Sequence, residues 1–163
     1  MKLIRNSGND RVVDELRKTL VAGGALDVAS PAFSLFAFAE LRDLLEQLHR
    51  VRLILPTANT ADLGLLGSPA DRAFRNRLLM LALARQCAQW IAKKAELRGT
   101  TTSIPQATII ATNPDHALDR VITGSCPFTT DGLGLTPGTQ FSLIQCSEAT
   151  NESTMLGSWF SYL

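Results

Sequence analysis

Short apolar segments that favour strands alternate with amphipathic segments that favour helices along the first two-thirds of the chain. Ala25–Ala29 and Val51–Leu55 are short strand-like runs, and Pro56 closes the second. Asp10–Leu20 and Ser34–Leu48 carry apolar side chains at helical spacing. Alternation of this kind predicts β-α-β units, in which successive strands are parallel and helices cover the sheet. We therefore expect an α/β fold.

The second half of the chain changes this pattern. The longest helix is expected from Ala70 to Lys94, where Ala, Leu, Arg, Gln and Met dominate. The strands expected after it are Ala95–Arg98, Ala107–Ala111, Arg120–Thr123 and Gln140–Cys146, and a final helix is expected from Glu148. Because these strands follow one another without long helices between them, the sheet should be mixed rather than purely parallel.

The length of 163 residues predicts one domain, residues 1–163, with a core that needs no disulfide. Hydrophobic residues make up 45% and charged residues 19%, a composition typical of globular and not of disordered proteins. The apolar stretches fall short of the roughly 20 residues that a membrane span needs, and no apolar segment of a secretory signal follows the N-terminus. Three cysteines without a C-x-x-C pair indicate reduced thiols. We expect a cytoplasmic protein with no membrane partner.

Signals for metals and cofactors are weak. The only histidines are His49 and His116, and neither has a second ligand three or four residues away. A nucleophile and base pair of Cys126 with His116 stays open, because such partners need only meet in space. The glycines of 132–138 lack the spacing of a dinucleotide loop and the Lys of a phosphate loop, and are interpreted as a turn. We expect no metal and no cofactor.

The long helix is the most basic part of the chain. Residues 1–98 hold 15 of the 16 Lys and Arg residues but only 10 of the 15 Asp and Glu residues. Guanidinium groups hold phosphate oxygens without reading sequence. The candidate nucleic-acid-binding residues on this helix are Arg72, Arg75, Arg77 and Arg85. A solvated helix face without a partner is the alternative interpretation.

Residues 122–133 carry the motif with the clearest chemical meaning. Gly124-Ser125 end an expected strand, Phe128-Thr129 follow, and Gly132-Leu133 come next. This pattern resembles a corner of the phospholipase D superfamily, in which Gly-Ser is followed by a small residue, Asn, an apolar residue and Thr or Ser, with Gly-Leu a few residues on. Pro127 stands where that family has Asn. The resemblance implies an α/β fold of the phospholipase D/nuclease type, a mixed sheet flanked by helices.

Active members of that superfamily carry His-x-Lys on a strand just upstream of the corner. The His attacks phosphorus and the Lys neutralises the developing charge, so both must point to the same face of the strand. The matching strand here has Gln106 and Thr108 in those places, and no Lys follows Lys94 anywhere in the chain. The resemblance therefore implies a degenerate site with no catalytic residue. Its positions are Gln106, Thr108, Gly124, Ser125 and Thr129.

Overall likeness extends to the phospholipase D-like domains found at the N-terminus of bacterial Swi/Snf-type and related helicases, through residues 6–10, 26–38 and 71–94. It implies an N-terminal fragment of a longer ATP-dependent helicase. The domain would bind nucleic-acid phosphates or mediate assembly, with the helicase/ATPase region or a second copy in a homodimer as partner. One alternative is a phosphodiesterase or nuclease of the same superfamily that uses unorthodox or partner-supplied catalytic residues. Another is a purely structural assembly module.

Overall fold

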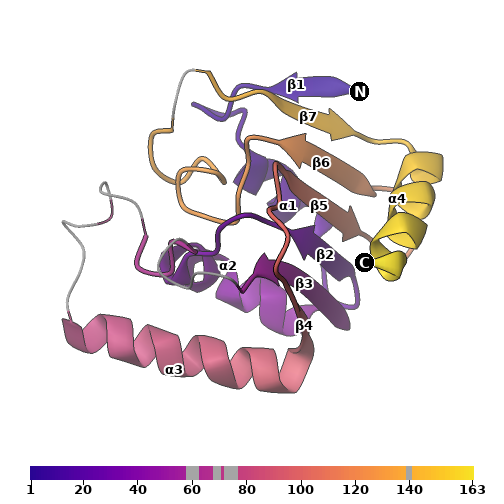
Figure 1. Ribbon diagram of the computed structural model, residues 1–163. Coiled ribbons are helices and arrows are strands. Elements are labelled where there is room, and N and C mark those ends of the chain that lie inside the picture. The colour runs from indigo at the N-terminus through magenta and orange to yellow at the C-terminus, as the bar shows by residue number, and fades with distance from the viewer. Residues whose placement is uncertain (58–62, 68–70, 72–76, 139–140) are drawn as a thin grey trace.

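The computed structural model describes residues 1–57, 63–67, 71, 77–138 and 141–163. Within this part of the chain seven strands form one sheet in the order β1-β7-β6-β5-β2-β3-β4 (Figure 1). The strands are β1 (Lys2–Ile4), β2 (Ala25–Ala29), β3 (Arg50–Pro56), β4 (Ala95–Thr100), β5 (Ala107–Thr112), β6 (Arg120–Gly124) and β7 (Ile144–Ser147). Strands β2, β3 and β4 are parallel, whereas β5, β6, β7 and β1 are each antiparallel to their neighbours.

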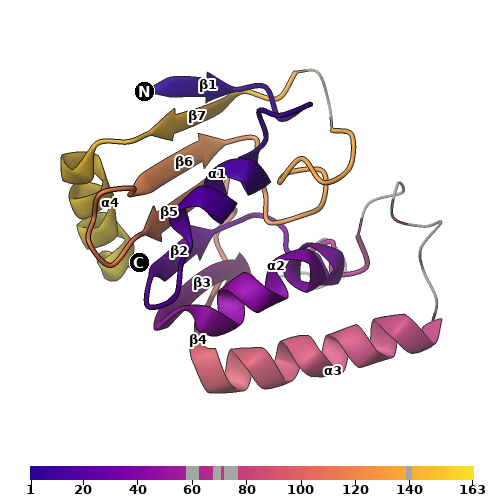
Figure 2. The same ribbon diagram turned by 180° about the vertical axis from the view of Figure 1, so that it is seen from behind.

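Helices cover both faces of this sheet. They are α1 (Val12–Thr19), α2 (Leu35–Gln47), α3 (Arg77–Lys94) and α4 (Thr150–Tyr162). Figures 1 and 2 show α1 and α2 on one face and α4 on the other, while α3 lies alongside α2 as an outer layer. The expected α/β fold with a mixed sheet flanked by helices is therefore confirmed. No helix in the described ranges is both long and apolar enough to cross a membrane.

Side chains alternate between the two faces, as the pleat of a strand requires. Leu26 and Val28 of β2 belong to the large apolar cluster under α1 and α2, which also takes in Phe38. Ala29 of β2 belongs to a smaller cluster on the opposite face, together with Phe160 of α4. The apolar cluster under α4 is thus much smaller than the cluster under α1 and α2.

Some boundaries differ from the sequence expectation. Strand β1 was not expected, because three residues are too few to show a period; its pairing with β7 creates it. The strand expected over 140–146 begins only at Ile144, and the last helix begins at Thr150 instead of Glu148. Helix α3 is described from Arg77, and its expected start at Ala70 lies outside the described residues.

Glu15 of α1 is a buried carboxylate that cross-links the sheet to the helix layer. Its Oε1 accepts hydrogen bonds from Lys2 Nζ at 2.8 Å and Lys18 Nζ at 2.9 Å, and Arg120 Nε lies 3.5 Å from Oε2. Burial acts to raise the pKa of Glu15, but the hydrogen bonds from Lys2 and Lys18 outweigh burial and hold the pKa below its usual value.

Glu15→Gln should lower the free energy of unfolding at pH 7 by about 1–3 kcal/mol, because charge-assisted hydrogen bonds are lost. A depressed folded-state pKa means that wild-type Glu15 contributes fully above its unfolded pKa, about 4.3, and loses this contribution as the pH falls through the folded value. The gap between wild type and variant should therefore begin to narrow as the pH falls below about 4.3 and should close below the folded-state pKa, as measured by urea unfolding. Glu40→Gln, on the exposed side of α2, should follow wild type throughout. A gap that does not narrow as the pH falls from about pH 5 to pH 2 would contradict this account.

Candidate functional site

The candidate site lies at one end of the sheet, where the parallel strands terminate. Ala29 pairs with both Ile54 and Thr108, so the carboxyl ends of β2 and β3 meet the start of β5. Gly124 pairs with Ala107 and Ile144, which adds the end of β6 and the start of β7. Ligands of open α/β sheets bind beyond the carboxyl ends of the strands, where the order of strands changes direction.

Four of the five degenerate-site positions come together here. Gln106 lies directly before β5, Thr108 is its second residue, and Gly124 and Ser125 end the neighbouring strand β6. A cavity of about 330 Å³, the corner cavity, is lined by Gln106, Thr123, Gly124 and Ser125. An adjoining cavity of about 360 Å³, the strand-end cavity, is lined by Gln106 and Thr108. Gln106 therefore stands between the two cavities.

Thr129, the fifth predicted position, serves the turn rather than either cavity. Its side chain is 7% exposed, and its hydroxyl donates to Asp131 Oδ1 at 2.7 Å. The same hydroxyl oxygen accepts a hydrogen bond from the backbone N–H of Gly132 at 3.2 Å. Thr129 thus fixes the path of the chain after the corner, and its match to the family pattern reflects local structure here.

Contacts from distant parts of the chain hold the corner in place. Phe128 stacks on Phe33 with ring centroids 5.3 Å apart and planes 8° apart. The backbone N–H of Phe128 donates to Ser30 Oγ at 2.9 Å, and the N–H of Ser34 donates to the carbonyl of Phe128 at 2.9 Å. Asn6 donates from Nδ2 to the carbonyls of 131 and 132. Ser30, Phe33 and Asn6 were not singled out as site residues, because only the fold brings them to the corner.

The two cavities offer hydrogen bonds and little charge. Gln106 and Ser125 are exposed, and Thr108 is 7% exposed. Arg98 of β4 also lines the strand-end cavity, with its guanidinium on Glu96 Oε1 at 2.7 and 2.9 Å. Among the described residues that line the two cavities there is no histidine, cysteine, lysine, aspartate or glutamate side chain. The arrangement can hold an oxyanion, but it has no nucleophile paired with a base.

Both histidines lie at the opposite end of the sheet. His49 Nδ1 lies 2.8 Å from the carbonyl oxygen of Gly23, and His116 Nδ1 lies 3.0 Å from Asp119 Oδ2. His116 precedes β6 and Cys126 follows it, so the five-residue strand separates them by roughly 17 Å. Burial also raises the pKa of Cys126 to about 12. The structure therefore rules out the Cys126–His116 pair considered from the sequence.

The basic helix is only partly described. Arg85 is exposed on α3, as are Lys93 and Lys94 near its end. Arg72 and Arg75 lie outside the described residues, and Arg77 is the first residue of α3. The α2–α3 groove, a cavity of about 530 Å³, is lined by cations from both helices. Those cations are Arg42, Lys93 and Lys94, beside the carboxylate of Glu46.

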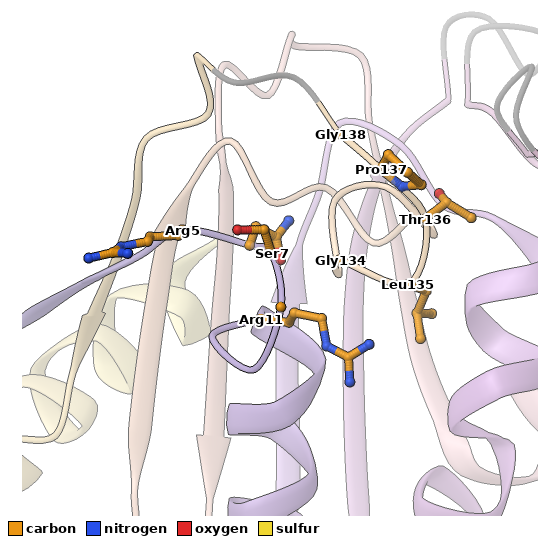
Figure 3. Close-up of a pocket in the computed structure, with 10 residues that line it drawn as sticks. Arg5, Ser7, Arg11, Gly134, Leu135, Thr136, Pro137 and Gly138 are labelled. Carbon is orange, nitrogen blue, oxygen red and sulfur yellow. The ribbon is translucent and has the colours of Figure 1, made fainter.

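The most voluminous of the cavities described, about 590 Å³, lies beside α1 and contains none of the predicted positions. Arg5, Ser7 and Arg11 line it together with residues 134–138. Figure 3 shows Arg5 and Arg11 pointing away from one another, and the guanidinium of Arg11 is held by Asp14 at 2.8 and 2.9 Å. This cavity therefore lacks converging charge. Its 134–138 segment is the glycine-containing turn that the sequence predicts, with Gly134 at a φ of +77°.

No family model matches the sequence, and none of the curated proteins compared with it does. Among solved structures, the chain is similar to a mutant of yeast tyrosyl-DNA phosphodiesterase 1, with a TM-score of 0.47 and 16% sequence identity. The matched region covers 89% of this chain and 30% of that one, so the chain spans less than a third of the length of the yeast enzyme.

Proposed function

We propose that this chain is a phospholipase D-like domain that binds nucleic-acid phosphates and does not cleave them. The observation that carries the proposal is the grouping of Gln106, Thr108 and Ser125 where the parallel strands terminate. These are the places where the sequence resemblance puts the remnants of a phosphodiesterase site. Amide and hydroxyl groups there can donate hydrogen bonds to phosphate oxygens.

Cleavage is disfavoured by the same side chains. Displacement at phosphorus needs an activated nucleophile and a proton donor, and a Ser or Thr hydroxyl is weak without an adjacent base. The chain has no Lys after Lys94, and both histidines belong to the other end of the sheet. The alternative function is a phosphodiesterase whose catalytic pair comes from a partner. Metal-independent turnover of a phosphodiester reporter that is lost in Gln106→Ala would favour that alternative.

The wider context belongs to the same proposal. The likeness of residues 6–10, 26–38 and 71–94 to helicase-associated domains supports a place at the N-terminus of a longer bacterial, cytoplasmic helicase. The helicase/ATPase region and a second copy of the domain are the proposed protein partners. The exposed cations of α3 supply the electrostatic part of nucleic-acid binding in this proposal, because phosphate contacts dominate such affinity.

Arg85→Glu should weaken the binding of fluorescein-labelled single-stranded DNA by roughly tenfold at 50 mM NaCl, because a phosphate-facing cation becomes an anion. The salt dependence of binding, measured by fluorescence anisotropy from 50 to 200 mM NaCl, should also become shallower by roughly one phosphate contact. The matched control is Arg17→Glu. Arg17 is exposed on α1, and Figure 2 shows α2 lying between α1 and α3.

Arg17→Glu changes the net charge by the same amount, so it should leave both the affinity and its salt dependence close to wild type. Equal weakening by the two variants would reduce the effect to net charge and contradict a role for α3. A wild-type protein that fails to bind at 50 mM NaCl would overturn the proposed function, and the purely structural module would then be favoured.

A further inference from the structure

The strand-end cavity combines an apolar floor with an aromatic wall. Ala29 and Ile54, each 5% exposed, contribute the floor from β2 and β3. Trp159 of α4 also lines the cavity and gives it an aromatic wall. With a volume of about 360 Å³, the cavity lies in the size range of small-molecule sites, which are mostly apolar with a few well-placed polar groups.

Trp159 is 42% exposed, so part of its indole is available for contact. It packs edge-on against Phe160, with ring centroids 6.4 Å apart and planes 76° apart. Phe160 is 1% exposed, and the guanidinium of Arg52 lies over its ring, 5.0 Å from the centroid. The exposed part of the indole can receive a flat ring, and base stacking on aromatic side chains is a main source of affinity for single strands.

The polar groups around the cavity suit the edge of a heterocyclic base. Gln106 and Thr108 line it, and neither side chain makes a hydrogen bond within the described part of the chain. An amide and a hydroxyl can each donate and accept, as the edges of nucleobases require. Among the described residues that line the cavity, Arg98 is the one charged side chain and no Asp or Glu side chain is present, which favours a neutral or anionic ligand over a cationic one.

Gln106 also lines the corner cavity, where Ser125 is exposed. A ligand that fills the strand-end cavity can therefore place an attached phosphate beside Gln106 and Ser125. We infer that the strand-end cavity receives an unpaired nucleobase of a single-stranded nucleic acid, stacked on Trp159, with its phosphate in the corner cavity. This inference rests on the proposed function, since it supplies the base-binding part of the same site.

The two tryptophans of the chain make the inference testable by fluorescence. Trp90, 5% exposed, lies between α2 and α3 and packs on Phe38, away from the strand-end cavity. In Trp90→Phe the emission comes from Trp159 alone, and an oligothymidylate should quench it. An abasic oligonucleotide of the same length should bind without quenching. In Trp159→Phe only Trp90 emits, and because Trp90 lines the α2–α3 groove with Lys93 and Lys94, the two probes should change its emission to the same extent or not at all.

The affinities for oligothymidylate and for the abasic oligonucleotide, measured by anisotropy of labelled probes, should also respond differently to changes at Trp159. Trp159→Ala should weaken oligothymidylate binding roughly tenfold and leave abasic binding unchanged, while Trp159→Phe should restore most of the loss because the ring is kept. A blunt duplex should bind wild type and Trp159→Ala equally. If oligothymidylate and abasic probes bind equally in wild type, the nucleobase inference is overturned while phosphate binding stands. If neither probe binds wild type, the proposed function fails as well.

Discussion

Gly124→Ala should destabilise the protein by roughly 3 kcal/mol or more, because two costs add at this position. The φ of Gly124 is +121°, a conformation that residues with a Cβ rarely adopt. A Cβ there would also overlap the carbonyl oxygen of Leu143 and lie 3.3 Å from the Cα of Ile144. Both contacts are with backbone at the start of β7, so no side-chain rotation relieves them.

Gly157→Ala is the matched control, since it makes the same chemical change inside α4. Nothing lies within 4 Å of a Cβ at that position, and glycine is a poor helix former. This variant should gain about 0.5–1 kcal/mol. Urea unfolding followed by circular dichroism measures both. A loss of less than about 1 kcal/mol in Gly124→Ala would show that the corner can open, and would contradict a rigid Gly124–Leu143 approach.

The Gly-Ser pair therefore has a structural explanation of its own. Gly124 allows β6 and β7 to approach at the corner, and the backbone N–H of Ser125 donates to the Leu143 carbonyl at 3.0 Å. These contacts aim the Ser125 side chain at the corner cavity. The geometry of this turn alone therefore accounts for glycine at position 124.

The sequence could predict only those site residues that lie close to the Gly-Ser motif along the chain. Gln106 and Thr108 are placed near Gly124 by the resemblance to the phospholipase D pattern, and the pairing of β5 with β6 brings both close to the corner, although Gln106 lies just before β5 instead of on it. Trp159 and Arg98 could not be placed in this way. They come from α4 and β4, and only the order of strands brings these elements to the same cavity. The link from Phe128 to Ser30 spans 98 residues and leaves no periodic signal.

Replacement of Arg52 is expected to be the second strongly destabilising change, because Arg52 forms a buried ion pair. Its Nε donates to Asp27 Oδ1 at 2.7 Å and its Nη2 to Oδ2 at 2.5 Å. The two side chains are only 12% and 4% exposed. The hydrogen bond with Asp27 raises the pKa of Arg52 above its usual value. Nη1 also donates to Ser161 Oγ at 3.0 Å, so this guanidinium ties the sheet to α4.

Arg52→Met should lower the free energy of unfolding by about 3–5 kcal/mol, because it leaves the Asp27 carboxylate buried without its main partner. Arg50→Met is the matched control. Arg50 reaches the same carboxylate at 3.4 Å from a position 48% exposed, and exposed ion pairs contribute about 1 kcal/mol or less. The free energies of unfolding of the two variants, measured in urea, should therefore differ. Equal losses would show that the charge near Asp27 matters and that burial of the pair does not.

The double variant Asp27→Leu with Arg52→Met should recover most of the loss, because apolar residues of similar volume replace a buried pair at little cost. Recovery would show that the penalty in Arg52→Met comes from the stranded carboxylate. The double variant still lacks the contacts of Arg52 with Phe160 and Ser161. Their absence should loosen α4 and leave the rest of the fold unchanged. In a Trp90→Phe background, the emission of Trp159 should then shift to longer wavelength at urea concentrations below the main transition. Two results would contradict this account and place the role of Arg52 in overall packing. One is a double variant less stable than Arg52→Met. The other is a Trp159 emission change that coincides with the main unfolding transition measured by circular dichroism.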